Sequence, residues 1–336
     1  MAENDKRTEK ASNDEGVKKE TKKEDDLANE ISKLTLTDKT EDEHNDNNGN
    51  KRTAIPPEIQ DVADWIKSSK RIMVLSGAGV SVAAGIPDFR TPGTGLYDNL
   101  QEYNLPYPEA VFELDFFRQN PQPFLRLAKE IWPGLIHSPT LTHSFLCLLH
   151  KKQQRLLRVY SQNIDGLEFL AGLPAEKIVE CHGHFRTVTC IECFSPVKDV
   201  QAYRDAVVNG NNDSASSPPV CEYCGGHVKP DIVFFGEQLP DRFHNLLTVD
   251  VPKADLLLVM GTSLQVAPVS MIPHYVNCKR VLVNRDEVGE FDFDSKKKKD
   301  IFLQGNCDDT IMLLAKALGW EDELTELHRE SKVNKE

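Results

Sequence analysis

The sequence lacks any apolar run near the ~20 residues that a membrane-spanning helix needs. Its N-terminus also lacks the apolar core of a signal peptide, so we expect a protein that neither spans a membrane nor is secreted. A basic excess is missing too, because 53 Asp and Glu residues outnumber 40 Lys and Arg residues and give a net charge of −13. Non-specific affinity for nucleic acid depends on clustered Lys and Arg, so this charge argues against direct nucleic-acid binding.

The first 50 residues contain no aromatic side chain and few apolar ones, but they carry 15 acidic and 9 basic residues. Because this composition cannot offset the entropy cost of folding, we predict a disordered acidic tail over residues 1–53. The tail is also unlike an Arg-rich, acid-poor mitochondrial presequence. Within it, "LANEISKLTL" at 27–36 has the leucine spacing of a nuclear-export signal, which would make a nuclear-export receptor a partner. A transient amphipathic turn explains that spacing equally well.

Six short aliphatic runs in the rest of the chain are mostly apolar without alternation, as in strands buried on both faces of a parallel sheet. They are "RIMVLS", "RLLRVYS", "KIVEC", "DLLLVMG", "RVLVN" and "DIFLQG". Helical patterns occur at "PPEIQDVADWIKSSK", "NPQPFLRLAKEIW", "PTLTHSFLCLLHK" and "DDTIMLLAKALG". This alternation predicts an α/β fold with a doubly wound, mainly parallel, Rossmann-like sheet. Nearly every run ends at small or polar residues, which predicts a ligand site at the carboxyl edge of the sheet.

The stretch "GAGVSVAAGIPDFR" follows the first predicted strand, as the turn of a dinucleotide-binding fold does. In dehydrogenases that turn reads G-x-G-x-x-G. Here Gly77-Ala78-Gly79 is followed by Val82 at the place of the third glycine, and the next glycine is Gly85. The broken spacing disfavours hydride transfer and leaves a tight turn into a short helix whose free N–H groups suit a pyrophosphate. An ordinary strand-to-helix turn has the same pattern.

Four of the eight cysteines form two C-x2-C pairs, Cys190 with Cys193 and Cys221 with Cys224. Each pair directs two thiolates at one tetrahedral centre, so the quartet predicts a zinc site. Four thiolates leave no coordination position for water, and the zinc is therefore expected to be structural and not catalytic. The alternative ligand set would include a histidine from "CHGHF" at 181–185.

Taken together, the motifs of residues 72–320 resemble those of the sirtuins, the NAD-dependent protein-lysine deacylases. They are "GAGVSVAAGIPDFR", "SQNIDGLE", "CHGHF", the two C-x2-C pairs, "VKPDIVFFGEQLP", "GTSLQV" and "VNRD". Within the family, "TGLYDNL", "LPYPEAVFE" and "KPDIVFFGE" look most like the cytoplasmic sirtuin-2 type of class I.

The resemblance implies a domain organisation as well as a fold. A sirtuin catalytic domain at 54–320 would be followed by a charged C-terminal tail at 321–336. The domain would comprise a large Rossmann-like lobe at 54–185 and 231–320, and a small zinc-binding module at 186–230 with helical loop segments of 90–140.

The resemblance also implies roles for individual residues. His182 would be the general base, because an imidazole with an ordinary pKa of about 6.5 can accept a ribose hydroxyl proton at neutral pH. Asn163 would be the second catalytic residue. The implied NAD site comprises Gly77, Ala78, Gly79, Ala83, Asp88, Phe89, Arg90, Gln162, Asn163, Ile164, Asp165, Gly261, Thr262, Ser263, Asn284, Arg285 and Cys307. The implied acyl-lysine site comprises Val233, Phe234, Phe235, Gly236 and Glu237.

Structural roles remain open for some of these residues. Asp165 could cap the helix that begins after it, a role compatible with binding. Thr262 and Ser263 could be turn residues. The apolar stretch "DIVFF" could be plain core packing, which is its commoner fate in an arbitrary protein.

The implied activity is the NAD-dependent removal of acetyl and longer apolar acyl groups from protein lysine, yielding nicotinamide and O-acyl-ADP-ribose. Carboxylated acyl groups are disfavoured because Leu100 stands three residues after Tyr97, where succinyl-removing sirtuins carry an arginine. The implied partners are acyl-lysine proteins such as tubulin or histones, met in the cytoplasm or, by shuttling, in the nucleus. Mono-ADP-ribosyl transfer onto protein at the same NAD site and a non-catalytic zinc scaffold are the alternatives.

Overall fold

The structure is a computed structural model that describes residues 55–88, 105–134, 136–152, 154–210, 218–295 and 298–333. The predicted tail at 1–53, the export motif at 27–36 and two implied NAD-site residues, Phe89 and Arg90, lie outside the described residues. In the part of the chain that is described, no helix combines the length and the apolar character that crossing a bilayer requires.

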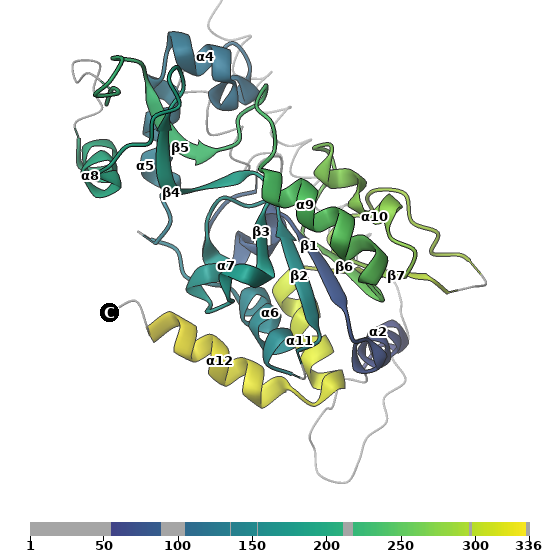
Figure 1. Ribbon diagram of the computed structural model, residues 1–336. Helices are drawn as coiled ribbons and strands as arrows, with labels where there is room; N and C mark the ends of the chain where they lie inside the picture. The colour runs from purple at the N-terminus through teal and green to yellow at the C-terminus, as the bar shows by residue number, and fades with distance from the viewer. Residues whose placement is uncertain are drawn as a thin grey trace, which may run out of the picture. The chain divides into compact units, whose positions relative to one another are not determined.

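Six parallel strands form one sheet in the order β3-β2-β1-β6-β7-β8 (Figure 1). They are β1 (Ile72–Ser76), β2 (Leu156–Ser161), β3 (Ile178–Glu180), β6 (Leu256–Met260), β7 (Lys279–Asn284) and β8 (Asp300–Gln304). Each of the six aliphatic runs supplies one strand, which confirms the predicted α/β fold with a mainly parallel sheet. Along the chain the strand order is that of the Rossmann fold, and the winding reverses between β1 and β6.

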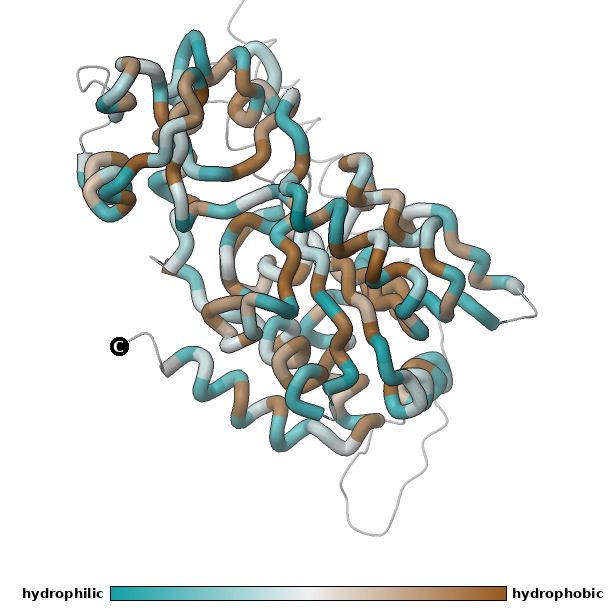
Figure 2. The backbone as a smooth tube through the Cα atoms, viewed as in Figure 1, coloured by the Kyte–Doolittle hydropathy of each residue, from teal (hydrophilic) through white to brown (hydrophobic). Residues whose placement is uncertain are grey.

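The side chains of β1 alternate between two apolar cores, because this strand is buried on both faces. Ile72 and Val74 belong to the core with α2, α6 and α11, whereas Met73 and Leu75 belong to the core with α9 and α10. These helices are α2 (Pro57–Ser68), α6 (Leu141–Lys151), α9 (Asp241–Asp250), α10 (Ile272–Tyr275) and α11 (Cys307–Leu318). Brown segments along the central strands in Figure 2 mark the same apolar interior.

The last helix, α12 (Glu321–Val333), extends the folded body beyond residue 320, where the sequence places the end of the domain. It lies against α6 and α11 (Figure 1), and Leu324 is fully buried in the core that those helices share. Charged residues dominate the helix, so its few apolar contacts give only a weak signal in the sequence. Residues 321–333 therefore contribute to the core of the sheet lobe.

A second structural unit lies apart from the sheet and has its own core (Figure 1). It contains β4 (Gly183–Cys190), β5 (Val228–Ile232), α4 (Leu114–Gln119), α5 (Gln122–Ile131) and α8 (Val200–Asn209). Strands β4 and β5 pair antiparallel, and phenylalanines from 112–124 pack with Phe234. We call these elements with the four cysteines the small module, and the six-stranded sheet with its helices the sheet lobe.

Short helices complete the described residues, and several of them lie near the carboxyl edge of the sheet. They are α7 (Leu167–Leu170), η1 (Ala78–Val80), η2 (Val82–Ala84), η4 (Pro108–Phe112), η5 (Ala175–Lys177), η6 (Val251–Lys253) and η7 (Val269–Met271). The four helical patterns of the sequence coincide with α2, α5, α6 and α11, whereas α4, α8 and α9 had no such prediction.

Candidate active site

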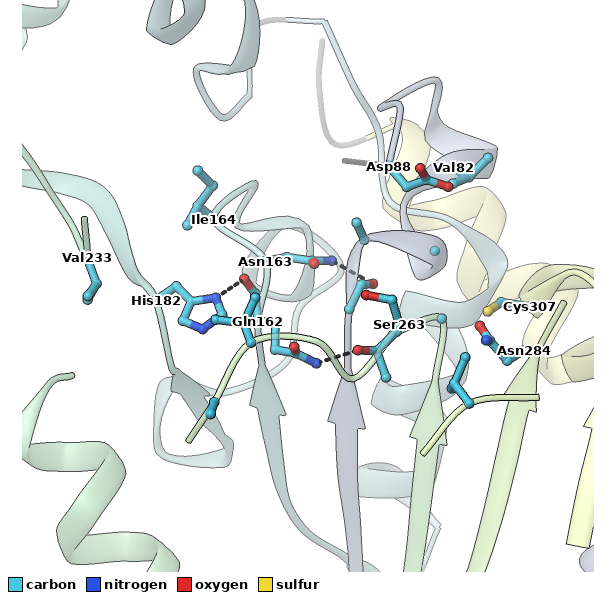
Figure 3. Close-up of a pocket in the computed structure, with 18 of the residues that line it drawn as sticks. Val82, Asp88, Gln162, Asn163, Ile164, His182, Val233, Ser263, Asn284 and Cys307 are labelled. Atoms are coloured by element: carbon cyan, nitrogen blue, oxygen red, sulfur yellow. Dashed lines mark hydrogen bonds between the residues drawn. The ribbon is translucent and has the colours of Figure 1, made fainter. Parts of the chain in front are cut away.

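A cavity of about 1070 Å³ lies at the carboxyl edge of the sheet (Figure 3). Each of the six parallel strands contributes residues that follow its last position. These are Gly77 after β1, Gln162 after β2, His182 after β3, Gly261 after β6, Arg285 after β7 and Gly305 after β8. The polar ends of the aliphatic runs are thus brought together as the sequence predicts.

The glycine turn after β1 lies against the turn after β6, at the point where the sheet reverses its winding. Gly79 donates its N–H to the carbonyl oxygen of Gly261 at 2.8 Å. A Cβ atom on Gly77 would lie 2.7 Å from Cβ of Thr262, and one on Gly79 would lie 2.7 Å from Cα of Gly261. Only glycine fits both positions. The expected short helix consists of the two 3₁₀ turns η1 and η2, and Gly85 closes the second with a φ of 83°.

His182 is held at both its ring and its backbone, and Figure 3 shows the ring beside Gln162. The ring Nδ1 lies 2.8 Å from the carbonyl oxygen of Gln162, which can only accept, so Nδ1 carries the proton. The backbone carbonyl of His182 accepts the N–H of Val233 at 2.8 Å. Nε2 is buried without a hydrogen-bond partner among the described residues. Burial lowers the pKa of His182, so Nε2 presents a free lone pair at neutral pH.

Asn163 and Asp165 belong to a hydrogen-bonded network beneath the cavity. The amide of Asn163 donates to the carbonyl oxygen of Gly77 and to Oγ of Ser81, both at 3.2 Å. Ser81 in turn donates to Asp165 at 2.7 Å, and Asp165 also accepts the N–H of Leu167 at 2.9 Å. Asp165 precedes Gly166, the N-cap of α7, and accepts the N–H of the first helical residue, so it supports the start of the helix while it also orients Ser81. Ser81 is a site residue for which no sequence motif gave a prediction.

Asp165 does not line the large cavity. It lines a smaller adjoining cavity of about 50 Å³, which it shares with Ala78, Asn163 and Ile164. Those three residues also line the large cavity, so the two spaces meet at the same walls. All other implied NAD-site residues that the structure describes line the large cavity.

A second buried acid, Glu168, lies close to this network. Ligating atoms of His143, Asp165 and Glu168 all lie within 4.8 Å of one another. Burial, reinforced by the nearby charge of Asp165, raises the pKa of Glu168 to about 7. The sheet lobe thus contains a carboxyl group that titrates near neutral pH.

The far end of the cavity is lined by residues after β6, β7 and β8. Thr262 accepts from the side-chain amide of Gln162 at 2.9 Å and from the N–H of Leu264 at 3.1 Å, so it also acts as a turn residue. Arg285 forms an ion pair of 2.9 Å with Asp88. The Cys307 thiol is buried, which raises its pKa to about 12 and keeps it protonated. Cavity-lining residues outside the implied NAD site include Asp286, Asn306, Asp308 and Asp309.

The residues implied for acyl-lysine binding all line the cavity but differ in exposure. Phe234 is 1% exposed and packs edge-on against Phe112, Phe117 and Phe124 with ring centroids 4.8–6.0 Å apart. Phe235 is 43% exposed. The core-packing alternative therefore describes Phe234, whereas Phe235 presents its ring to the open side of the cavity.

The four cysteine sulfurs gather at one point of the small module. Sγ of Cys190 lies 3.5 Å from Sγ of Cys224, and Sγ of Cys193 lies 3.6 Å from Sγ of Cys221. All four sulfurs are within 4.8 Å of one another. Tetrahedral zinc with bonds of about 2.3 Å separates its sulfurs by about 3.8 Å, so the cluster fits a structural zinc ion. No histidine of "CHGHF" is part of the cluster.

Known proteins resemble this chain over most of its length. The model of the Sir2 family matches residues 77–268. Mouse NAD-dependent protein deacetylase sirtuin-3 is 48% identical over 273 residues, which cover 80% of this chain and 78% of that protein. The fission-yeast deacetylase hst2 is 46% identical over 273 residues, covering 80% and 79%. Zebrafish NAD-dependent protein deacetylase sirtuin-2 is 44% identical over 287 residues, covering 80% and 74%.

Proposed function

Since this chain belongs to the Sir2 family, we propose that it is an NAD-dependent protein-lysine deacetylase that yields nicotinamide and O-acyl-ADP-ribose. The observation that carries the proposal is the Nε2 atom of His182, which is unpartnered in the described part of the chain. The surrounding residues fit NAD, because the loops that follow β1 and β6 meet where dinucleotides bind in this fold. When bound, NAD supplies an electrophilic sugar carbon, since nicotinamide departs as a neutral molecule.

His182 is the group in this site that can take a proton. The bond from Nδ1 to the carbonyl oxygen of Gln162 fixes the tautomer that leaves Nε2 basic. A ribose hydroxyl that approaches Nε2 loses its proton there and gains nucleophilic character. Because burial lowers the pKa of His182, the base stays unprotonated at neutral pH.

Asn163, Ser81 and Asp165 hold the nicotinamide end of the cavity in one arrangement. Each member of the network is buried and hydrogen-bonded, so its side chain is oriented before any ligand enters. Asn163 would contact the nicotinamide ribose with Gln162, and Asp165 with Ile164 the nicotinamide amide. The turn at 77–79 and Arg90 would hold the phosphates, and Phe89 would shield the reactive carbon.

Acyl-lysine would enter beside Val233 and the exposed ring of Phe235. Val233 lies next to the proposed base, because its N–H donates to the backbone carbonyl of His182. The apolar lining favours acetyl and longer apolar acyl groups over carboxylated ones. By resemblance, the protein substrates would include tubulin or histones and the location would be the cytoplasm, with 27–36 as an export signal.

The proposal also includes the domain boundaries. The large lobe would comprise 54–185 and 231–320, and the zinc-binding module would comprise 186–230.

The experiment is an assay of acyl-lysine peptides of graded chain length with and without NAD, read by mass spectrometry. Loss of the acyl mass together with nicotinamide release is expected only when NAD is present. A gain of ADP-ribose on the peptide would favour mono-ADP-ribosyl transfer, and no nicotinamide release would favour a scaffold.

His182→Tyr should lower turnover by about 10²–10⁴-fold, the contribution of a positioned general base. Zinc content and the thermal midpoint should stay at wild-type values, because the substitution lies outside the three apolar cores. His274→Gln, at an exposed position on α10, is the matched control. Full activity of His182→Tyr would refute the assignment of the base.

A further inference from the structure

Lys229 is a buried lysine for which the reaction described above has no use. It lies in β5 of the small module and is only 5% exposed. Burying an ammonium group is costly unless charges and hydrogen bonds compensate for the lost water. The groups that compensate for its burial should therefore indicate the role of this lysine.

The ammonium group of Lys229 is surrounded by acceptors from the segment that leads to the cavity. Nζ lies 2.7 Å from the carbonyl oxygen of Ile232 and 3.4 Å from that of Pro230. It forms an ion pair of 2.9 Å with Oε2 of Glu237 and lies 4.6 Å from the ring centroid of Phe234. The lysine thus contacts both ends of the segment 232–237.

Glu237 links Lys229 to the backbone of the cavity wall. The same Oε2 atom accepts the backbone N–H of Phe234 at 2.7 Å. The N–H of Glu237 donates to the carbonyl oxygen of Phe234 at 3.0 Å, which closes a tight turn around Gly236 with its φ of 96°. Phe235, the exposed ring at the cavity, sits inside this turn.

The remaining bonds tie the turn to both structural units. Val233 donates to the carbonyl of His182 at 2.8 Å, and Phe235 donates to the carbonyl of Phe112 at 2.7 Å. Both bonds involve backbone atoms, so they depend on where the turn lies and not on side-chain chemistry. The Lys229–Glu237 pair is the charged contact that fixes that place.

We propose that Lys229 is a positioning residue for acyl-lysine binding, acting through Glu237 on the turn at 233–237. This inference rests on the proposed deacetylase function and adds a specificity element to the same site. Without Lys229, Glu237 loses its cation and turns toward water at the cavity mouth, and the turn that carries Phe235 loosens. In the described part of the chain, the side chains of Lys229 and Glu237 bond to each other and to backbone atoms of 230–234, and none of these partners belongs to the implied NAD site.

The test compares Lys229→Met with Lys229→Arg and Glu237→Gln, measuring kcat and KM separately for acyl-peptide and NAD. Lys229→Met should raise the peptide KM by about tenfold or more, since one partner of a buried pair is left alone. KM for NAD should stay within about twofold. Lys229→Arg should restore most of the peptide KM, because it keeps the charge. Lys253→Met, at an exposed lysine of η6, should behave as wild type.

The double variant Lys229→Met with Glu237→Gln separates positioning from general destabilisation. If the two residues act as a pair, its peptide KM should be no worse than that of Lys229→Met. Should Lys229→Met fail to fold or lose zinc, Glu237→Gln alone must still raise the peptide KM and leave that for NAD unchanged. An unchanged peptide KM, or equal rises for peptide and NAD, would overturn the inference.

Failure of the proposed function has a different signature. Binding of a fluorescent acyl-lysine peptide can be followed by anisotropy without turnover. If wild type binds the peptide and Lys229→Met binds it about tenfold more weakly, the positioning role stands even if no deacetylation occurs. If wild type deacetylates but the variants bind equally well, the proposed function stands and the role of Lys229 is refuted.

Discussion

The sheet lobe and the small module are stabilised by different means. In the sheet lobe, every residue of β1 and β6 is buried, and two apolar cores cover the two faces of the sheet. In the small module, a two-stranded sheet alone cannot bury enough apolar area, so a phenylalanine cluster and four cysteine thiolates supply the rest. One half of the site thus depends on the hydrophobic effect alone, whereas the other half combines a smaller apolar core with a metal site.

Zinc removal should have the largest effect and should separate the two units. Structural zinc contributes about 10–16 kcal/mol to the small domains that bind it. Chelation, or Cys221→Ser, should therefore expose the amides of β4, β5 and α8 to hydrogen exchange while β1 and β6 stay protected. Cys278→Ala, a cysteine outside the cluster, is the control. Equal loss of protection in both units would show that they unfold as one.

Gly183→Ala should have the next largest effect, because it acts where the two units join. Gly183 follows His182 with a φ of 78°, and a Cβ atom there would lie 2.0 Å from the carbonyl oxygen of Asp231. The strained backbone alone costs about 1–3 kcal/mol, and β5 must also move. We expect a lower thermal midpoint and a loss of peptide turnover larger than the loss of stability explains.

Gly172→Ala is the matched control for that substitution. Its φ of 93° is just as unfavourable for alanine, but nothing lies within 4 Å of the added Cβ. This variant should lose about 1 kcal/mol of stability and keep its kcat. If both glycine variants lose activity equally, the join at Gly183 has no special role.

The smallest expected effect concerns the buried acid of the sheet lobe. The pKa of Glu168 is raised to about 7 in the folded state, so the folded state binds the proton more tightly than the unfolded chain does. Its contribution to stability is fully present below about pH 4.5 and is lost as pH rises through about 7.

Glu168→Gln should accordingly be more stable than wild type at pH 8 and close to wild type at pH 4.5. Urea unfolding at both pH values measures the difference, and Glu176→Gln, at an exposed position, is the control. A Glu168→Gln variant that shows the same pH dependence as wild type would contradict the buried charge.

The sheet lobe and the small module also differ in how much of their structure could be predicted from the sequence. Strands buried on both faces need continuous apolar runs, so all six strands of the sheet lobe were visible as such runs. The zinc ligands were visible from spacing alone. In β4, by contrast, Arg186 and Thr187 are exposed in mid-strand, and no apolar run marks it. The phenylalanine cluster joins residues 112–124 to Phe234, and no local pattern records a contact across such a distance.

Some residues of the candidate site could likewise be predicted from the sequence and others could not. His182, Gln162 and Asn163 follow predicted strands, so topology brings them to one edge. Ser81 was missed because its part in the site depends on hydrogen bonds to Asn163 and Asp165, which lie more than eighty residues away in the chain. The roles of Phe89 and Arg90 stay predictions, since both lie outside the described residues.

The position of the module along the chain has a consequence for how such proteins can diversify. Most of it occupies the connection between β3, at one margin of the sheet, and β6, beside β1. That connection must span the sheet whatever its length, and its strands β4 and β5 pair with each other and not with the six-stranded sheet. Insertions, deletions or substitutions there can reshape the entrance for proteins bearing modified lysine while the dinucleotide half is inherited unchanged. Related enzymes can in this way share one nucleotide-binding scaffold and act on different substrate proteins.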